Sequence, residues 1–190
     1  MDNDQDLVDV RRVLEGDLGA FENIVRRWQT PLINLAYRFC RDRQRAEDMA
    51  QEAFLHIYRK LNKFSGNSAF STWIFSTALN LYRSSMRRKS LPVEPIDEQT
   101  EIASGYMPQM QLEQQEREEL LRRAVAVLPP RYRDAVIIYY FREMDLTETA
   151  AILGVPEGTV KAWLHRGREL LRRKLDSGGE TSLSVKEVPL

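Results

Sequence analysis

The stretch "ILGVPEGTVKAWLHRGRELLRRKL", residues 152–175, decides how the C-terminal part of the chain folds. A Gly-Val-Pro turn near its start leads into a long run of helix-forming residues. Residues 161–175 hold six Lys or Arg and a single acid, Glu169. A short helix, a turn that contains Gly and a longer basic helix are typical of a helix-turn-helix, whose second helix enters the major groove of DNA. The stretch therefore predicts a unit that binds duplex DNA.

The residues before the turn supply the first helix of this unit. In "DLTETAAIL", residues 145–153, Asp145 and Glu148 have the spacing of a capping box, with Asp in place of the usual Ser or Thr. Two further helices are predicted upstream, one from about Leu112 and a buried one over residues 131–141. A basic last turn alone would also suit the negative end of a solvated helix, so the DNA prediction depends on the whole unit.

The N-terminal part of the chain shows the same helical period. Between residues 7 and 28 apolar side chains recur at steps of three or four, and another helix is predicted over residues 69–88. No segment shows a sustained period of two, which a half-buried strand would need. The fold class is therefore predicted to be all-α.

Three residues predict where the N-terminal helices begin and bend. Asp17, after a Gly, is expected to cap the helix that follows it, and Asp42 is expected to cap a helix that runs to about Leu61. Pro31 falls within a helical pattern, where its ring and missing N–H predict a kink or a new helix start.

Charge divides the chain into segments. The whole chain is neutral, with 28 Lys or Arg and 28 Asp or Glu, but residues 91–115 hold five acids, no base and three prolines. Such a segment interrupts a helix and is typical of a linker. We predict two small helical domains, a linker and a disordered tail, at residues 1–90, 113–175, 91–112 and 176–190 respectively.

The composition excludes several classes of protein. The acidic N-terminus lacks the features of a signal peptide and no apolar run reaches 18 residues, so we expect a cytoplasmic protein that is not inserted in a membrane. Cys40 is the single cysteine, which excludes an internal disulfide. His56 and His165 lie in different segments, and no further residues complete a metal site or a phosphate loop. We therefore expect no catalytic residue, metal or cofactor.

An acidic, amide-rich face is predicted within "AEDMAQEAFLHIYRKL", residues 46–61. Asp48, Gln51, Glu52 and Tyr58 fall near one side of the helix, whereas the apolar residues point elsewhere. Most charged helix faces simply contact water. An acidic face would bind DNA poorly, so a function for it would be contact with another protein.

The segment "KFSGNSAFSTWIFSTALNLYRSSMRRK", residues 63–89, mixes aromatic residues with small polar residues and ends in basic ones. Single-stranded nucleic acid is bound by such a combination, because bases stack on rings while basic groups hold phosphates. The Ser-Gly-Asn-Ser loop would suit an extruded base. Each ring, taken alone, is equally consistent with an ordinary core residue.

The order of these motifs resembles a family. D-x-x-Q-E-x-F from Asp48, S-G-x-S-x-F-x-T-W from Ser65, L-P-x-x-x-R from Leu128 and G-V-P-E-G-T-V-K from Gly154 are together similar to the extracytoplasmic-function (ECF) group of bacterial RNA polymerase sigma factors. The resemblance implies a sigma region 2 bundle, a sigma region 4 helix-turn-helix, and a subunit that gives RNA polymerase core its promoter specificity. It also implies that the polymerase performs the chemistry.

The resemblance also assigns the polymerase contact. In the family, the helix that matches residues 46–61 docks on the clamp helices of the largest polymerase subunit. The matched residues are Asp48, Gln51, Glu52, Phe54 and Tyr58.

Two promoter contacts follow from the resemblance as well. The segment after the docking helix would capture the non-template strand of the opened minus-ten element and flip one base into a pocket. Its matched residues are Phe64, Gly66, Asn67, Ser68, Ala69, Trp73, Asn80, Arg83, Ser84 and Arg87. The helix-turn-helix would read the minus-thirty-five element as duplex. Its matched residues are Thr159, Lys161, Ala162, Trp163, His165, Arg166 and Arg168.

Several positions depart from the family pattern. Thr149 stands where an aliphatic residue is usual, which predicts looser packing of its helix. Ala162 and Trp163 replace a usual Ser-Arg pair, so the preferred upstream element should differ from the commonest one. Gly167 replaces a common Ala at a helix-propensity cost of about 1 kcal/mol.

Two other functions remain open from the residues alone. A stand-alone helix-turn-helix regulator would leave the acidic face and the aromatic segment without a role. An RNA-binding or scaffold protein would leave the Gly-Val-Pro-Glu-Gly-Thr stretch unexplained.

The partners implied by the resemblance are RNA polymerase core and promoter DNA, with an anti-sigma factor as a candidate because many relatives are held by one. The resemblance also implies that the linker threads toward the RNA exit path.

Overall fold

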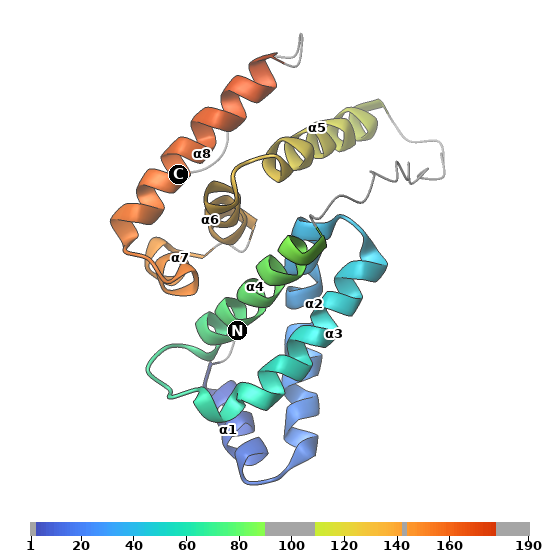
Figure 1. The fold of residues 1–190 in the computed structure, drawn as a ribbon. Helices are drawn as coiled ribbons and strands as arrows, with labels where there is room; N and C mark the ends of the chain where they lie inside the picture. Colours follow the sequence, from blue (N-terminus) through green and yellow to red (C-terminus); the bar gives the residue numbers. More distant parts are fainter. Residues whose placement is uncertain (1–2, 90–108, 142–143, 178–190) are drawn as a thin grey trace.

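The computed structural model describes residues 3–89, 109–141 and 144–177. Within these ranges the chain forms eight α-helices and one 3-10 helix without a strand, so the all-α prediction is confirmed (Figure 1). None of the helices in the described ranges is long and apolar enough to cross a bilayer. Most of the predicted linker and tail, at residues 90–108 and 178–190, lies outside the described residues.

The N-terminal unit is a bundle of four α-helices and one 3-10 helix. They are α1 (Asn3–Leu14), α2 (Leu18–Cys40), α3 (Arg43–Lys60), η1 (Leu61–Lys63) and α4 (Phe70–Lys89). Both predicted caps are confirmed, since Asp17 accepts a hydrogen bond from the N–H of Ala20 and Asp42 accepts one from Arg45. Of the two outcomes predicted at Pro31, a kink or a new helix start, the new start is wrong, because α2 continues through this residue. Pro31 is itself buried in the core, and packing on both sides of it offsets the lost backbone hydrogen bond.

The C-terminal unit contains the four remaining helices. They are α5 (Gln109–Ala126), α6 (Pro130–Phe141), α7 (Leu146–Leu153) and α8 (Glu157–Ser177). Helix α5 begins three residues before the predicted start at Leu112 and so takes up the end of the predicted linker. Pro130 opens α6, a position where a helix does not need the missing N–H.

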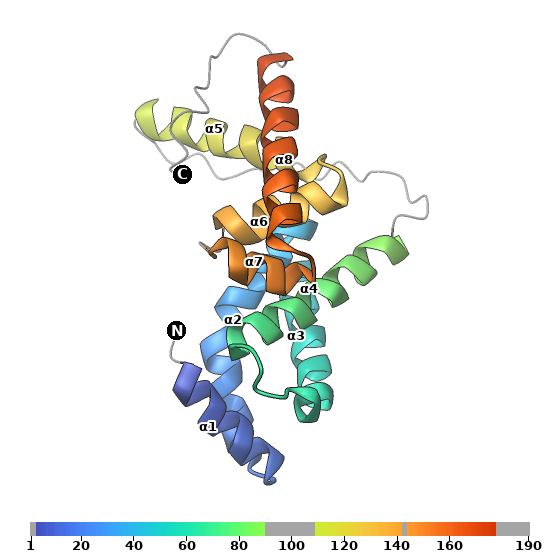
Figure 2. The same ribbon diagram turned by 90° about the vertical axis from the view of Figure 1, so that its left-hand side faces the viewer.

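The two units pack on one another through α4 and α7 (Figures 1 and 2). Arg83 Nε of α4 lies 2.7 Å from Asp134 Oδ2 of α6, and Asp134 is almost fully buried. The guanidinium of Arg133 lies over the Phe39 ring, 5.3 Å from its centroid. Helix α4 therefore contacts both the N-terminal bundle and the second unit, and its residue Arg83 is held by the second unit.

Candidate nucleic-acid and protein interfaces

The predicted acidic stripe lies on the exposed side of α3. Asp48, Gln51 and Glu52 are exposed, and Tyr58 is 42% exposed with its ring edge against Phe21. Leu55 continues the same stripe by helical spacing and is 58% exposed. The face therefore joins two carboxylates and an amide to an apolar pair, a combination suited to a protein partner.

Phe54 differs from the other members of the predicted contact set in its environment. Its side chain is only 8% exposed and lies in the hydrophobic core of the bundle. It therefore holds α3 in place from the inside and does not present its ring at the acidic face. The physical reason is the helix period, which turns Phe54 to the side of Ala50, Ala53 and Ile57.

The loop between η1 and α4 is exposed above an aromatic cluster. Ser65, Gly66, Asn67 and Ser68 are exposed, whereas Phe64 and Ala69 at the two ends are half-buried. Gly66 has a φ of +74°, a conformation that favours glycine. The loop is thus short, polar and fixed at both ends.

Three rings form the cluster below this loop. Phe64 lies 5.4 Å from Phe70 and 5.5 Å from Trp73, measured between ring centroids. Phe70 and Trp73 stack at 5.8 Å with an interplanar angle of 28°. Phe70 is fully buried, but Phe64 and Trp73 keep part of their surface open. The structure therefore brings the predicted loop and ring residues together.

Farther along α4 the predicted polar residues lie on one face of the helix but differ in exposure and in bonding partners. Asn80 and Arg87 are exposed and Ser84 is half-buried. Arg83 is committed to Asp134 of the second unit by the 2.7 Å contact. Sequence reasoning missed this partner because nothing near Arg83 or near Asp134 marks two residues 51 positions apart as neighbours.

The helix-turn-helix is built as predicted. The side chain of Asp145 accepts from the N–H of Glu148 at 2.7 Å, and Glu148 Oε2 accepts from the N–H of Asp145 at 3.1 Å. Gly154 ends α7 in the left-handed region, at φ +69°. Thr147 Oγ1 donates to Glu157 Oε1 at 2.8 Å and so joins the first turn of α7 to the first turn of α8. These local bonds fix the angle at which α8 leaves the turn.

The predicted reading residues divide between the surface and the interior of α8. Lys161, Ala162, His165 and Arg166 are exposed on neighbouring turns. Trp163 is half-buried and packs against the core, and Thr159 and Arg168 are half-buried too. Arg166 donates to Glu169 at 2.7 Å, and this bond holds the pKa of Glu169 below its ordinary value.

Two departures from the family pattern have structural outcomes. Thr149 is fully buried, and within the described ranges its hydroxyl has no hydrogen-bond partner. An unsatisfied buried hydroxyl costs about 1–3 kcal/mol. At Gly167 a side chain would lie 3.2 Å from Val136 Cγ2 of α6, so glycine permits the close approach of α8 to α6 there. The cost in helix propensity at Gly167 therefore has a packing reason.

The described part of the chain holds no group of three or more His, Cys, Asp or Glu that would suit a metal ion.

Family models match both units, "Sigma-70 region 2" over residues 24–91 and "Sigma-70, region 4" over residues 118–171. The ECF RNA polymerase sigma factor SigW of Bacillus subtilis is 34% identical over 87% of this chain and 94% of its own length.

The chain belongs to the ECF sigma factors. As a sigma factor it binds RNA polymerase core and directs promoter-specific initiation, and the alternative of a stand-alone regulator is not supported. The RNA polymerase sigma-H factor of Pseudomonas aeruginosa is 32% identical over 92% of this chain and 94% of that protein. The ECF sigma-E factor of Escherichia coli K12 is 31% identical over 90% and 94%.

Solved structures share the fold of this sigma factor. CnrH, in complex with the cytosolic domain of CnrY, superposes with a TM-score of 0.67 at 22% identity and covers 94% of this chain and 100% of its own. The sigma factor RpoE of Bartonella quintana, in complex with the anti-sigma factor NepR, gives 0.59 at 21% identity over 82% and 96%. At these identities the likeness concerns the fold.

Sequence reasoning about this sigma factor missed Leu55 and Asp134. Leu55 lies three positions after Glu52, so extending the stripe by one helical step would have found it. Asp134 offered no comparable signal, because its role depends on how the two units pack.

Proposed function

We propose that this sigma factor divides initiation among three surfaces on α3, on α4 with its preceding loop, and on α8. The observation that supports this division is that three exposed residue sets of different chemistry lie on three separate elements. Residues 1–90 would dock on the polymerase and bind the minus-ten strand, and residues 113–175 would bind the minus-thirty-five duplex. The polymerase forms the bonds, and the chain adds specificity without a catalytic group of its own. It acts where the polymerase is, in the cytoplasm.

The α3 stripe is the proposed docking surface for RNA polymerase core. Asp48, Gln51 and Glu52 offer charge and hydrogen bonds, and Leu55 and Tyr58 offer apolar area beside them. Apolar groups that exclude water strengthen the neighbouring polar contacts, so both kinds of residue belong to such an interface. The clamp helices that this face would contact must carry a basic surface.

The loop and the ring cluster are the proposed site for the minus-ten strand. Unstacked bases would meet the open surfaces of Phe64 and Trp73, and Asn67, Ser68 and Asn80 would offer hydrogen bonds to an extruded base. Arg83 is paired with Asp134 in the packed arrangement, so its contact with a phosphate requires that the units separate at α4.

The exposed face of α8 is the proposed reader of the minus-thirty-five duplex. Lys161 and Arg166 bring positive charge and His165 adds a donor beside them. Glu169 competes with DNA for Arg166. Arg166 would therefore leave Glu169 only for a phosphate or base acceptor that comes within hydrogen-bond distance. Because Trp163 packs inward and Ala162 is small, this pair leaves the centre of the face less polar than the usual Ser-Arg would.

An anti-sigma factor is a proposed partner as well. The packed arrangement of this chain has the fold of RpoE, which was solved with the anti-sigma factor NepR. A protein that stabilised the contact between α4 and α7 would keep Arg83 on Asp134 and away from the strand.

Charge reversal on α3 tests the division of tasks. We expect Asp48→Lys with Glu52→Lys to lower affinity for RNA polymerase core by on the order of 100-fold, because the two acids would then face a basic partner with the wrong sign. Promoter-dependent transcription should fall in parallel, while binding of a minus-thirty-five duplex stays unchanged. Core affinity would be measured by fluorescence titration and initiation by run-off transcripts.

A matched control reverses two acids elsewhere. Glu15→Lys with Glu22→Lys changes net charge by the same amount at exposed positions of the α1–α2 region. This variant should bind core as the wild type does. Unchanged core affinity in the α3 variant, or an equal loss in the control, would exclude α3 as the docking surface.

A further inference from the structure

The start of α4 is capped by a residue that lies 67 positions earlier in the chain. Asn3 Oδ1 accepts a hydrogen bond from the backbone N–H of Phe70 at 2.9 Å. The first N–H groups of a helix have no partner within the helix, and a side-chain oxygen usually supplies one. Ala69, whose carbonyl accepts from Trp73 N–H, has no such oxygen. Helix α1 therefore supplies an acceptor that Ala69 cannot supply.

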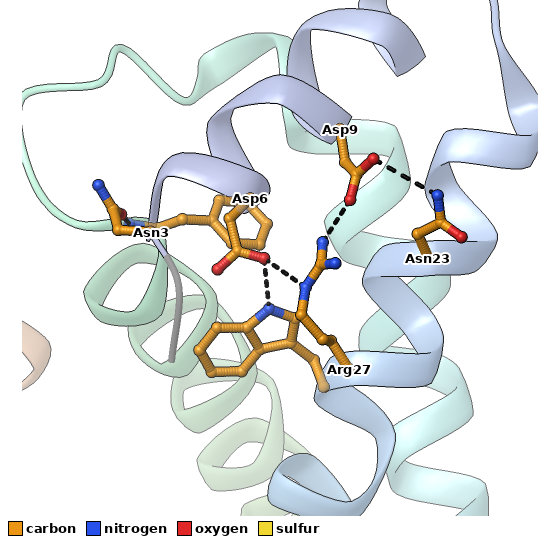
Figure 3. A network of polar contacts seen from close by, with 7 residues as sticks. Asn3, Asp6, Asp9, Asn23 and Arg27 are labelled. Atoms are coloured by element: carbon orange, nitrogen blue, oxygen red, sulfur yellow. Dashed lines mark hydrogen bonds and ion pairs between the residues drawn. The ribbon is translucent and has the colours of Figure 1, made fainter.

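A second residue of α1 fixes a ring beneath this helix start (Figure 3). Asp6 is 1% exposed, and its Oδ1 accepts from Trp28 Nε1 at 3.0 Å. A buried indole N–H requires a partner, so this bond sets the orientation of the Trp28 ring. Phe70 meets that ring edge to face, with the centroids 6.1 Å apart. Asp6 thus acts on Phe70 through Trp28.

Arg27 holds the carboxylates of α1 in place. Its Nε donates to Asp6 Oδ1 at 2.9 Å and another of its nitrogens donates to Asp9, which also accepts from Asn23 at 3.4 Å (Figure 3). Burial acts to raise the pKa of Asp9, but the hydrogen bonds from Arg27 and Asn23 outweigh it and hold this pKa below its ordinary value. Buried carboxylates stay charged only when they are paired in this way.

From Phe70 the contacts continue to the proposed strand site. Phe70 stacks on Trp73 and lies 5.4 Å from Phe64, and these two rings are the ones with open surface. Phe64 also begins the exposed loop at residues 64–69. A shift of the α4 start would therefore move both rings and the loop together.

We propose that Asn3 and Asp6 are positioning residues for recognition of the minus-ten strand. They hold the start of α4 and the Trp28–Phe70 contact in the geometry in which the loop and Trp73 meet the bases. Neither residue touches the strand. This role rests on the strand contact proposed above for residues 64–87. A preformed site binds more tightly because less conformational freedom is lost on binding.

Asn3→Ala and Asn3→Asp make a matched pair of variants. Alanine removes the acceptor, whereas aspartate keeps an oxygen and adds a charge that suits a helix N-terminus. Full-length protein bound to polymerase core would be titrated with a fluorescent single strand that carries the minus-ten element of a promoter it transcribes. We expect Asn3→Ala to weaken strand binding about fivefold, the effect of one lost cap, and Asn3→Asp to restore it.

Asp17→Ala is the control for stability alone. It removes the side-chain cap of α2 and the acceptor for Arg12, at a position about 20 Å from Asn3 along α1. This variant should unfold at lower temperature but bind the strand as the wild type does.

Asp6→Asn keeps an acceptor for Trp28 but loses the charge that pairs with Arg27. Its affinity for the strand should lie between that of the wild type and that of Asn3→Ala. Duplex binding should be unchanged in every variant.

A direct-contact variant separates failure of this inference from failure of the strand site. Asn67→Ala with Asn80→Ala removes two exposed side chains of the proposed site. If this variant loses strand affinity and Asn3→Ala does not, or if Asn3→Asp fails to restore binding, the positioning role is wrong. If the direct-contact variant and Asn3→Ala both bind normally, the strand site itself is wrong, and the positioning role with it.

Discussion

The two helical units place their exposed residues through contacts of very different range along the chain. In the C-terminal unit, Asp145 and Glu148 cap each other's backbone, and Thr147 bonds to Glu157 ten residues later. In the N-terminal unit, the start of α4 is bonded to Asn3 across 67 positions, and the ring beneath it to Asp6 across 22. The helix-turn-helix is thus held by contacts between near neighbours in sequence, whereas the start of α4 is held by residues that meet it only when the bundle packs.

This difference has consequences for stability and for function. Local contacts form at little cost in loop-closure entropy, whereas contacts between distant residues form only when most of the chain around them is already ordered. The turn of the helix-turn-helix should therefore tolerate damage elsewhere in the protein. The strand site should be lost as a whole when a buried ring at the centre of the N-terminal core is removed.

Removal of the central ring of the bundle should give the largest effect. Trp28 is fully buried and meets both Phe70 and Phe75 edge to face. We expect Trp28→Ala to destabilise the N-terminal unit by roughly 3–5 kcal/mol and to abolish strand binding. Duplex binding by α8 should stay within about twofold of wild type, since distant sites are usually independent. Urea unfolding followed by circular dichroism and the two DNA titrations would measure this.

Trp28→Phe tests the same core position with a smaller change. It keeps a ring in the core but removes the indole N–H that Asp6 accepts, and we expect a smaller loss of about 1–3 kcal/mol. If Trp28→Ala instead weakens duplex and strand binding equally in a single unfolding transition, the packing of α7 on α4 makes the two units one cooperative fold. The contrast between local and long-range construction would then fail.

A change at the turn should have a smaller and more confined effect. At Gly154 a new side chain would meet nothing within 4 Å, so Gly154→Ala costs only the strain of φ +69°. We expect about 1–2 kcal/mol of lost stability, with weaker duplex binding and unchanged strand binding. Gly154→Asn should recover part of the loss, because Asn tolerates this conformation.

Gly158 provides the matched control for the turn. A side chain there also meets nothing within 4 Å, but the backbone of Gly158 is ordinary helix. Gly158→Ala should therefore stabilise α8 by up to about 1 kcal/mol. Thermal unfolding of both variants would distinguish backbone strain from side-chain contact, and equal destabilisation by the two changes would contradict a left-handed requirement at Gly154.

The smallest expected effect is a difference in response to acid. The pKa of Asp9 is held below its ordinary value near 3.8, so the folded state binds a proton less readily than the unfolded state. Its contribution to stability is therefore complete above about pH 4 and is lost as the pH falls through the lowered value. Glu169 also has a lowered pKa, but its pair with Arg166 is solvent-exposed and should contribute little.

Asp9→Asn tests this acid dependence. Urea midpoints measured between pH 3 and pH 7 should show a shallower loss below about pH 4 in the variant than in the wild type. Glu169→Gln should leave the acid dependence as it is in the wild type. An identical pH profile for wild type and Asp9→Asn would show that the Arg27 pair does not stabilise the folded state.

Much of the fold was predictable from short stretches of sequence. The caps at Asp17 and Asp42, the capping box and the Gly154 turn all depend on residues within one helical turn of each other. The new helix start at Pro31 was not borne out, because burial of residues before and after it outweighed a local preference. Phe54 was assigned to the docking contact by resemblance, and its side chain lies in the core.

The helices, the caps at Asp17, Asp42 and Asp145, the Gly154 turn and the family could all be predicted from residues that lie close together along the chain. Three features depend instead on how the helices pack: Asn3 caps α4, Arg83 pairs with Asp134, and Gly167 permits the close approach of α6. The reason is physical. A helix and its caps are set by neighbours three or four residues away, whereas partners 51 or 67 residues apart meet only after the helices pack.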